Sequence, residues 1–231
     1  IMAISIDTVY QKVLTFANKE QRGYITPQQF NLFADQAQKE IFEQYFYDLN
    51  QVARAPGRSE EYSDYADNLN EKVAIFEKTE TTTSSSGSTL TLASSVNTIY
   101  RLGTVTESGR EVEEVQQNEL LYMNQSPLTA PNESRRVYVR TGANKISVTP
   151  PTSNVDFTYV ASPLKPSWGY VVVNERAMYD SNNTVNFELH PAEESELVYR
   201  ILAFAGISMQ KPNLTQTAMG LEAVKQQQEK K

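Results

Sequence analysis

The stretch from Thr26 to Asn50 constrains the fold more than any other part of the chain, because it predicts one long helix with a wide apolar surface. Thr26, Pro27 and Gln29 form a strong helix start: a capping threonine, a proline at the first helical position and the glutamine that completes a capping box. Apolar side chains then recur every three or four positions, at Phe30, Phe33, Ala37, Ile41 and Tyr45. This spacing predicts one apolar stripe along the helix.

The last turns of this helix carry a second apolar stripe, made of Phe42, Phe46 and Leu49. A helix that is apolar on nearly every side has to be covered on every side. One small bundle covers one face, so we expect a second subunit to cover the rest, and alanine at Phe42 and Phe46 to leave a folded but assembly-deficient protomer. Aromatic anchors are typical of interface centres. The predicted subunit-interface residues are Phe42, Tyr45, Phe46, Tyr47 and Leu49.

Helices are also predicted on either side of this stretch. Asp7 is placed to cap a first helix from Thr8 to about Asn18, and a third helix is expected from Ser59 to about Lys78. The Pro56-Gly57 pair fits the connection before the third helix. The low-complexity Ser/Thr stretch Glu80–Thr89 is expected to be a flexible loop or an extended arm.

From Leu90 to about Leu189 the apolar period becomes two, which is typical of strands. Ser108-Gly109 is a hairpin signal between two such runs, and a turn at Gly142–Asn144 joins two more. Short strands joined by tight turns predict an antiparallel meander rather than parallel β-α-β units. A short helix at Asn118–Met123 is expected within this region.

Helical patterning returns after the β region. Pro191 suits a first helical position, Glu193, Glu194 and Glu196 place negative charge in the first turns, and a last polar helix follows. The predicted class is therefore α+β: a discontinuous helical bundle, built from N-terminal and C-terminal helices, with an inserted antiparallel β domain. The predicted boundaries are 1–79 for the N-terminal part of the bundle, 80–189 for the β domain and 190–231 for the C-terminal helices and tail.

The composition argues against several chemistries and partners. The chain of 231 residues has no cysteine, which excludes thiol catalysis and zinc–thiolate sites, and no cofactor or metal is expected. Its net charge of −7 argues against wrapping nucleic acid, because phosphate binding needs a basic surface. No apolar run approaches the roughly 20 residues that span a bilayer, so no membrane partner is expected.

Candidate catalytic residues are few, and no enzyme activity is expected. His190 is the single histidine and precedes a proline, so we expect a residue at a helix start rather than a base or a metal ligand. Carboxylates on predicted strands could pair for glycoside cleavage, although solvated charges on an edge strand have the same pattern. These carboxylates are Glu111, Glu113, Glu114 and Asp156.

Two further features have a binding interpretation and a structural one. The one basic cluster is formed by Arg135, Arg136 and Arg140, where a solvated or salt-bridged face is favoured over a contact with DNA. Trp168, the only tryptophan, follows a predicted strand. Packing across the base of the β region is favoured over a platform for stacking sugars.

Three parts of the chain resemble a known family. They are KEQRGYITPQQFNLFADQAQKEIFEQYF (Lys19–Phe46), the stretch from Pro131 to about Trp168 with RRVYVR, KISVTPP, VDFTYV and SPLKPSW, and FELHPAEESELVYRILAFAGISM from Phe187 with the last polar helix. Together they resemble virion proteins of short-tailed and crAss-like bacteriophages that form adaptor or ring layers between portal and tail. The tip between Gly103 and Asn132 has no counterpart in this resemblance.

The resemblance implies a structural head-to-tail connector protein: a dodecameric ring that links portal to tail and lets DNA through its channel without sequence-specific binding. The implied partners are further copies of the chain, the portal protein and other tail or ring proteins. The implied location is the head–tail junction of the virion, assembled in the cytoplasm of a bacterial host. The alternatives are another tail layer or tail-tube component, and a glycan-binding or glycan-cleaving tail module.

Overall fold

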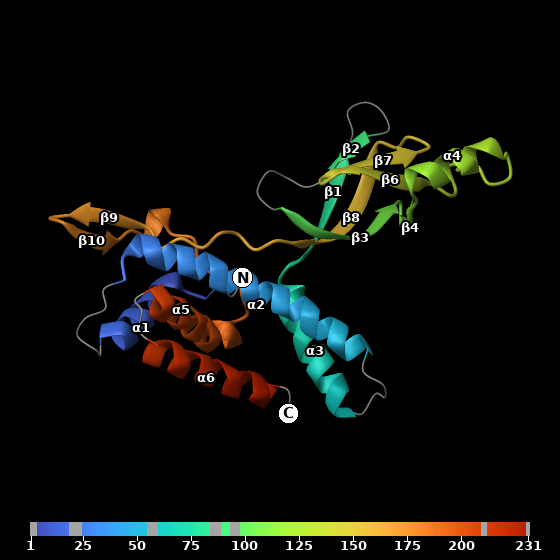
Figure 1. The fold of residues 1–231 in the computed structure, drawn as a ribbon. Coiled ribbons are helices and arrows are strands. Elements are labelled where there is room, and N and C mark those ends of the chain that lie inside the picture. The colour runs from blue at the N-terminus through green and yellow to red at the C-terminus, as the bar shows by residue number, and fades with distance from the viewer. Residues whose placement is uncertain are drawn as a thin grey trace. The chain divides into compact units, whose positions relative to one another are not determined.

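The computed structural model describes residues 4–18, 25–54, 60–83, 89–92, 98–208 and 212–229. The chain divides into two compact units, a helical unit of residues 1–75 with 163–231 and a β unit of residues 76–162 (Figure 1). Helices from both ends of the chain flank a central region of strands, which confirms the predicted α+β class. The Pro56-Gly57 pair and residues 84–88 of the Ser/Thr stretch lie outside the described residues.

Within the described ranges, the helical unit combines five α-helices with a small hairpin. The predicted capping box is present at the start of the second helix: the Thr26 hydroxyl accepts from the Gln29 N–H at 3.3 Å, and the Gln29 side chain accepts from the Thr26 N–H at 3.2 Å. The elements are α1 (Ile6–Asn18), α2 (Pro27–Arg54), α3 (Glu60–Ala74), α5 (Glu194–Ser208), α6 (Pro212–Glu229), the 3-10 helices η1 (Ser181–Asn183) and η2 (Pro191–Glu193), and the antiparallel strands β9 (Tyr170–Val173) and β10 (Arg176–Tyr179).

The most deeply covered helix of this unit is α5, which packs against α1, α2 and α6. Burial on several sides requires apolar side chains on several sides of a helix. The apolar side chains of α5 that are at most 4% exposed are Leu197, Val198, Ile201, Leu202 and Ala205. The helix α5 therefore lies at the centre of the unit, a position that the sequence pattern had suggested for α2.

By contrast, α2 buries a main stripe and leaves other side chains in solvent. Phe30, Ala37 and Ile41 of the predicted stripe are at most 1% exposed, whereas Leu32 and Tyr47 are 62% and 61% exposed. The spacing of buried residues by three and four positions is that of an amphipathic helix on the surface of a bundle. The first apolar stripe predicted for this helix is confirmed.

The described residues of the β unit form two four-stranded sheets with strand orders β1-β8-β3-β4 and β2-β7-β6-β5. All pairs are antiparallel except β5 with β6, which is parallel. The strands are β1 (Glu77–Thr83), β2 (Thr89–Thr91), β3 (Ile99–Glu107), β4 (Arg110–Glu111), β5 (Glu113–Glu114), β6 (Val137–Gly142), β7 (Lys145–Thr149) and β8 (Asn154–Ala161), and the helix α4 (Gln117–Gln125) follows β5.

The predicted meander is therefore wrong as a topology, although two of its turns are correct. Ser108 and Gly109, with φ of +49° and +77°, join β3 to β4 as a tight hairpin, and a second short turn joins β6 to β7. The last strand of the β unit, β8, inserts between β1 and β3, so its neighbours in the sheet are not its neighbours in the sequence. The short helix predicted at Asn118–Met123 is present as α4.

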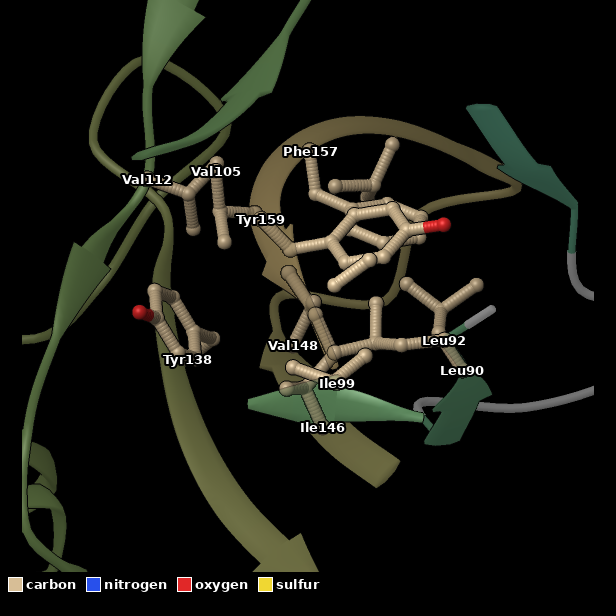
Figure 2. Packing of buried hydrophobic residues seen from close by; sticks show 12 residues of the cluster. Leu90, Leu92, Ile99, Val105, Val112, Tyr138, Ile146, Val148, Phe157 and Tyr159 are labelled. Carbon is tan, nitrogen blue, oxygen red and sulfur yellow. The ribbon is translucent and has the colours of Figure 1, made fainter. Parts of the chain in front are cut away.

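One hydrophobic core joins the two sheets of the β unit (Figure 2). Along β8 every second side chain is buried, as the alternation predicted: Val155, Phe157, Tyr159 and Ala161. They meet side chains of the other sheet, which include Leu90, Ile146 and Val148. The two sheets thus share their inward faces, as in a sandwich.

Two boundaries differ from those predicted. The third helix ends at Ala74, and β1 begins at Glu77 and pairs with β8 as far as Thr83, because a run of β-branched threonines favours a strand over a helix or a loop. The β unit ends at residue 162 rather than 189. The alternating pattern beyond residue 162 belongs to β9 and β10, which pair with one another in the helical unit.

The core of the β unit generates a stability prediction. Phe157 is 1% exposed, so Phe157→Ala is expected to lower the free energy of unfolding of this unit by about 3–5 kcal/mol. Leu128→Ala, at a side chain that is 93% exposed, is expected to cost less than about 0.5 kcal/mol. Amide hydrogen exchange in β8, measured by mass spectrometry, checks both values, and similar losses in the two variants would contradict the assignment of this core.

Candidate functional site

The five residues predicted as a subunit interface do not form one exposed surface. Phe42 and Tyr45 are buried, at 2% and 4% exposure, and Phe46 lies edge-to-face against Phe42 with the ring centroids 5.0 Å apart. Phe46 and Leu49 are half-buried, and Tyr47 is the exposed member of the five. The chain itself covers much of the second stripe, so Phe42→Ala is expected to cost about 3–5 kcal/mol of stability and not to leave the fold intact.

The exposed apolar side chains of the helical unit concentrate instead on the β9–β10 hairpin, which extends beyond the neighbouring helices of its own unit (Figure 1). Successive residues of a strand point to opposite faces, so three consecutive valines leave apolar groups on both faces. Such a run is typical of a strand covered on both faces, and an isolated two-stranded hairpin is marginally stable in water. The hairpin side chains that are 44–62% exposed are Val171, Val172, Val173, Met178 and Tyr179.

Trp168 fixes the base of this hairpin and is 3% exposed. Its ring centroid lies 5.9 Å from that of Tyr170, 5.8 Å from that of Tyr179 and 4.4 Å from that of Tyr10 in α1. The indole N–H donates to Asp7 Oδ1 at 2.9 Å. Both residues thus depart from their predicted places, because Trp168 packs within the helical unit and Asp7 lies inside the first turn of α1, which begins at Ile6.

Main-chain contacts hold the same base. The Asn31 side chain accepts from the Trp168 N–H at 2.8 Å and donates to its carbonyl oxygen at 3.3 Å. The Gly169 N–H donates to Thr184 Oγ1 at 3.1 Å. A Cβ atom on Gly169 would lie 2.6 Å from the carbonyl carbon of Asn183, so a glycine is required there. The hairpin is therefore firmly held where it leaves the helices, while its outer part carries the exposed apolar groups.

This packing predicts the effect of one added methyl group. Gly169→Ala is expected to displace the 180–184 segment and to shift the fluorescence emission of Trp168 to longer wavelength, because water reaches the indole. Gly220→Ala is the matched control, because a Cβ on this α6 glycine meets no atom within 4 Å, and alanine in a helix is favoured over glycine by about 1 kcal/mol. An unchanged emission spectrum in the Gly169 variant would contradict the close packing of Gly169 against residues 180–184.

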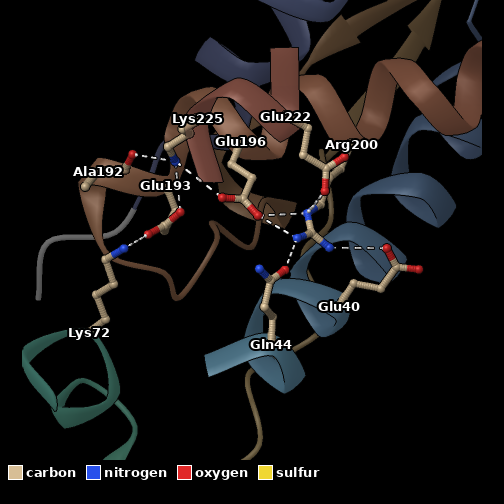
Figure 3. Close-up of polar contacts among 9 residues, drawn as sticks. All are labelled: Glu40, Gln44, Lys72, Ala192, Glu193, Glu196, Arg200, Glu222 and Lys225. Atoms are coloured by element: carbon tan, nitrogen blue, oxygen red, sulfur yellow. Dashed lines mark hydrogen bonds and ion pairs between the residues drawn. The ribbon is translucent and has the colours of Figure 1, made fainter. Parts of the chain in front are cut away.

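A buried cluster of charges lies around α5 (Figure 3). Its centre is Arg200, which is 7% exposed. Arg200 contacts Glu196 of the same helix at 2.6 Å, Glu222 of α6 at 3.2 Å and Glu40 of α2 at 3.5 Å, and it also donates to Gln44. A buried charge that lost its partner would cost several kcal/mol, so these contacts fix how α2 and α6 lie against α5.

A second part of the same cluster reaches α3. Glu193, 1% exposed, contacts Lys72 of α3 at 2.6 Å and Lys225 of α6 at 3.0 Å. Lys225 also lies 3.5 Å from Glu196 and donates to the Ala192 carbonyl oxygen at 3.2 Å. Sequence reasoning treated Glu193 and Glu196 only as helix-start charges, because their partners are distant along the chain. The cluster positions helices, and nothing in it marks a reacting centre.

The pKa values of the two glutamates of the cluster are shifted in opposite directions. Burial and the nearby Glu193 carboxylate raise the pKa of Glu196 above its ordinary value near 4.5, against the opposing pull of Arg200 and Lys225. For Glu193, ion pairs with Lys72 and Lys225 outweigh burial and lower the pKa. Because the folded form of Glu196 binds a proton more readily than the unfolded form, its contribution to stability increases as the pH falls from neutral toward its raised pKa.

Glu196→Gln is therefore expected to remove part of the pH dependence of the free energy of unfolding. The free energy of unfolding of the native chain should gain a contribution from Glu196 between pH 7 and pH 5, and the variant should lack this gain. Glu193 does not interfere in this window, because its lowered pKa acts below about 4.5. Urea titrations followed by Trp168 fluorescence at both pH values measure the difference, with Glu43→Gln as a surface control. Equal gains in native chain and variant would contradict the prediction.

The remaining candidate residues have structural partners. His190 caps η2, where its Nδ1 accepts from the Ala192 N–H at 3.2 Å. Arg135 contacts Glu113 at 3.1 Å, Arg136 contacts Glu107, and Arg140 donates to the carbonyl oxygens of its own turn. Arg135 and Arg136 thus form salt bridges, as the sequence favoured, while Arg140 is bonded to the backbone.

Two of the four candidate carboxylates lie across one sheet. Glu111 and Asp156 both pair with Thr106, one from each side, on the face opposite the core. They are therefore two strand spacings apart, roughly 10 Å, which exceeds the separation in retaining glycosidases and reaches the wide limit for inverting ones. Of the other two, Glu113 pairs with Arg135, and Glu114 accepts from the Tyr138 hydroxyl at 3.1 Å.

Over the ranges that the structure describes, no group of three or more acidic or histidine side chains is arranged to hold a metal ion. None of the helices in these ranges has the length and hydropathy of a membrane span. No family model matches the chain, and comparison with curated proteins also finds no match.

Proposed function

We propose that the chain is a structural subunit that forms a ring in the head-to-tail connector of a tailed bacteriophage and has no catalytic activity. The resemblance of Lys19–Phe46, Pro131–Trp168 and the C-terminal helices to adaptor and ring proteins supports the connector assignment. The single observation that carries self-association is the β9–β10 hairpin, whose apolar side chains are uncovered on both faces. The portal protein, other tail proteins and passing DNA are the proposed partners, and the virion head–tail junction is the proposed location.

A ring needs two different surfaces on each protomer, one of which meets the other on the next copy. The hairpin suits such a contact because a projection with two apolar faces is covered best when it inserts between surfaces of a neighbour. A stable contact buries about 800 Å² on each partner, so the hairpin forms the centre of a wider interface. The net charge of −7 favours a channel that DNA passes without binding.

Another tail layer or a tail-tube component shares all of these features and differs only in its position in the particle. A glycan-binding or glycan-cleaving module has less support. Trp168 is 3% exposed and offers no platform for a sugar, and Glu111 and Asp156 lie on a sheet face at the wide limit for a catalytic pair.

The hairpin assignment predicts the effect of buried charge on assembly. Val172→Asp with Met178→Asp is expected to weaken self-association at least tenfold, because each carboxylate would have to lose water without a partner. The fold should persist, since these side chains are 62% and 58% exposed. Sedimentation velocity over a concentration series, with electron microscopy of the assembled species, provides the measurement.

The matched control is Leu121→Asp with Tyr122→Asp on α4, at side chains that are 58% and 70% exposed. This pair introduces the same charge at similar exposure in the β unit and is expected to leave assembly unchanged. Assembly of the hairpin variant at the native level, or loss of assembly only in the α4 variant, would overturn the assignment of the hairpin as the self-contact.

A further inference from the structure

A second exposed apolar surface lies in the β unit, and its apolar residues belong to the part of the chain without a counterpart in the phage resemblance. We infer that this surface, here called the tip surface, docks a protein that presents an apolar pocket bordered by lysine or arginine. The name covers the exposed side chains of Leu121 and Tyr122 of α4, Leu128 of the following turn, and the exposed carboxylates of Glu119 and Glu133.

The helix that carries the tip surface is firmly seated. Leu120 and Met123 of α4 pack against a small buried cluster of Val115, Val137 and Val139, on the side of their sheet away from the main core. With one side of α4 occupied in this way, Leu121 and Tyr122 are left 58% and 70% exposed. The exposure of these two side chains is thus a consequence of how the helix is anchored.

The turn that carries Leu128 is also ordered by its own hydrogen bonds. The Thr129 hydroxyl donates to the Met123 carbonyl oxygen at 3.1 Å, and the Ala130 N–H donates to the Ser126 carbonyl oxygen at 3.0 Å, so the turn folds back on the last turn of α4. Leu128 is nevertheless 93% exposed. A large apolar group held out in water by an ordered turn contributes nothing to the fold, whereas a preorganised apolar group contributes directly to binding.

The charge around these side chains defines the partner. Residues 110–135 contain five carboxylates, those of Glu111, Glu113, Glu114, Glu119 and Glu133, against the guanidinium groups of Arg110 and Arg135, a net charge of −3. Within the described parts of the chain, no ion pair is formed by Glu111, Glu119 or Glu133. Glu119 precedes Tyr122 by three positions and so lies on the same side of α4.

This charge excludes several occupants and favours one. Nucleic acid and anionic membranes are repelled by the uncompensated carboxylates. A second tip surface would bring like charges together, and the chain as a whole is acidic, with a net charge of −7. A pocket with an apolar centre would take up the leucines and the tyrosine, and a basic rim would pair with the carboxylates beside them. The partner is therefore a basic protein surface.

The test uses the full chain and a defined probe: a fluorescein-labelled helical peptide with one leucine stripe flanked by lysines. Binding is measured by fluorescence anisotropy at low and at high salt. The triple variant Leu121→Ser, Tyr122→Ser, Leu128→Ser is expected to bind at least tenfold more weakly. Glu119→Gln with Glu133→Gln is expected to reduce the loss of affinity that salt causes in the native chain.

Matched controls separate the tip surface from general attraction to an acidic protein. Val172→Ser with Met178→Ser changes apolar groups of similar exposure on the hairpin, and Glu43→Gln with Glu71→Gln removes two exposed charges elsewhere. Both pairs are expected to leave peptide binding unchanged. No binding by the native chain, or equal weakening by the control pairs, would overturn the inference. Loss of self-association in the triple variant would show instead that a second copy occupies the surface. The peptide measurement is independent of ring formation.

Discussion

The arrangement of helices in the helical unit depends on how the buried charge of Arg200 is paired. Its guanidinium lies against Glu196, Glu40 and Glu222, so one side chain of α5 sets the positions of α2 and α6, and Glu193 adds α3 through Lys72. Buried ion pairs contribute little net stability, because removing charges from water costs about as much as pairing returns. Their value lies in specificity, since any other arrangement of these helices would leave a charge unpaired in the interior.

This arrangement explains which apolar surface stays uncovered. With α5 at the centre, the helices close over their own aromatic stripe, and Phe42 and Tyr45 become part of the interior. Two groups of apolar side chains that the fold leaves in water lie elsewhere: on the hairpin, which Trp168 and Gly169 hold at its base, and on the tip surface of the β unit. The two surfaces differ in charge, because the tip surface is surrounded by carboxylates. They are therefore suited to different partners.

Local patterns predicted much of the fold, and long-range pairing was not predictable from them. The capping box at Thr26, the Ser108-Gly109 hairpin and the alternation along β8 each depend on residues within one turn or one strand. The insertion of β8 between β1 and β3 depends on which strands meet, and no local signal encodes this. The burial of Phe42 was not predictable for the same reason: Phe42 lies on an apolar stretch of helix, and only the folded chain decides whether its own residues cover the ring.

Oxidative footprinting of side chains in the dissociated and the assembled chain tests the central claim most directly, because one experiment compares the hairpin with the aromatic stripe of α2. The account predicts that Met178 and Tyr179 react readily in the dissociated chain and become protected on assembly, while Phe42 and Tyr45 react little in either state. The account would be contradicted if Phe42 and Tyr45 reacted in the dissociated chain and became protected only on assembly, while the reactivity of Met178 and Tyr179 stayed the same.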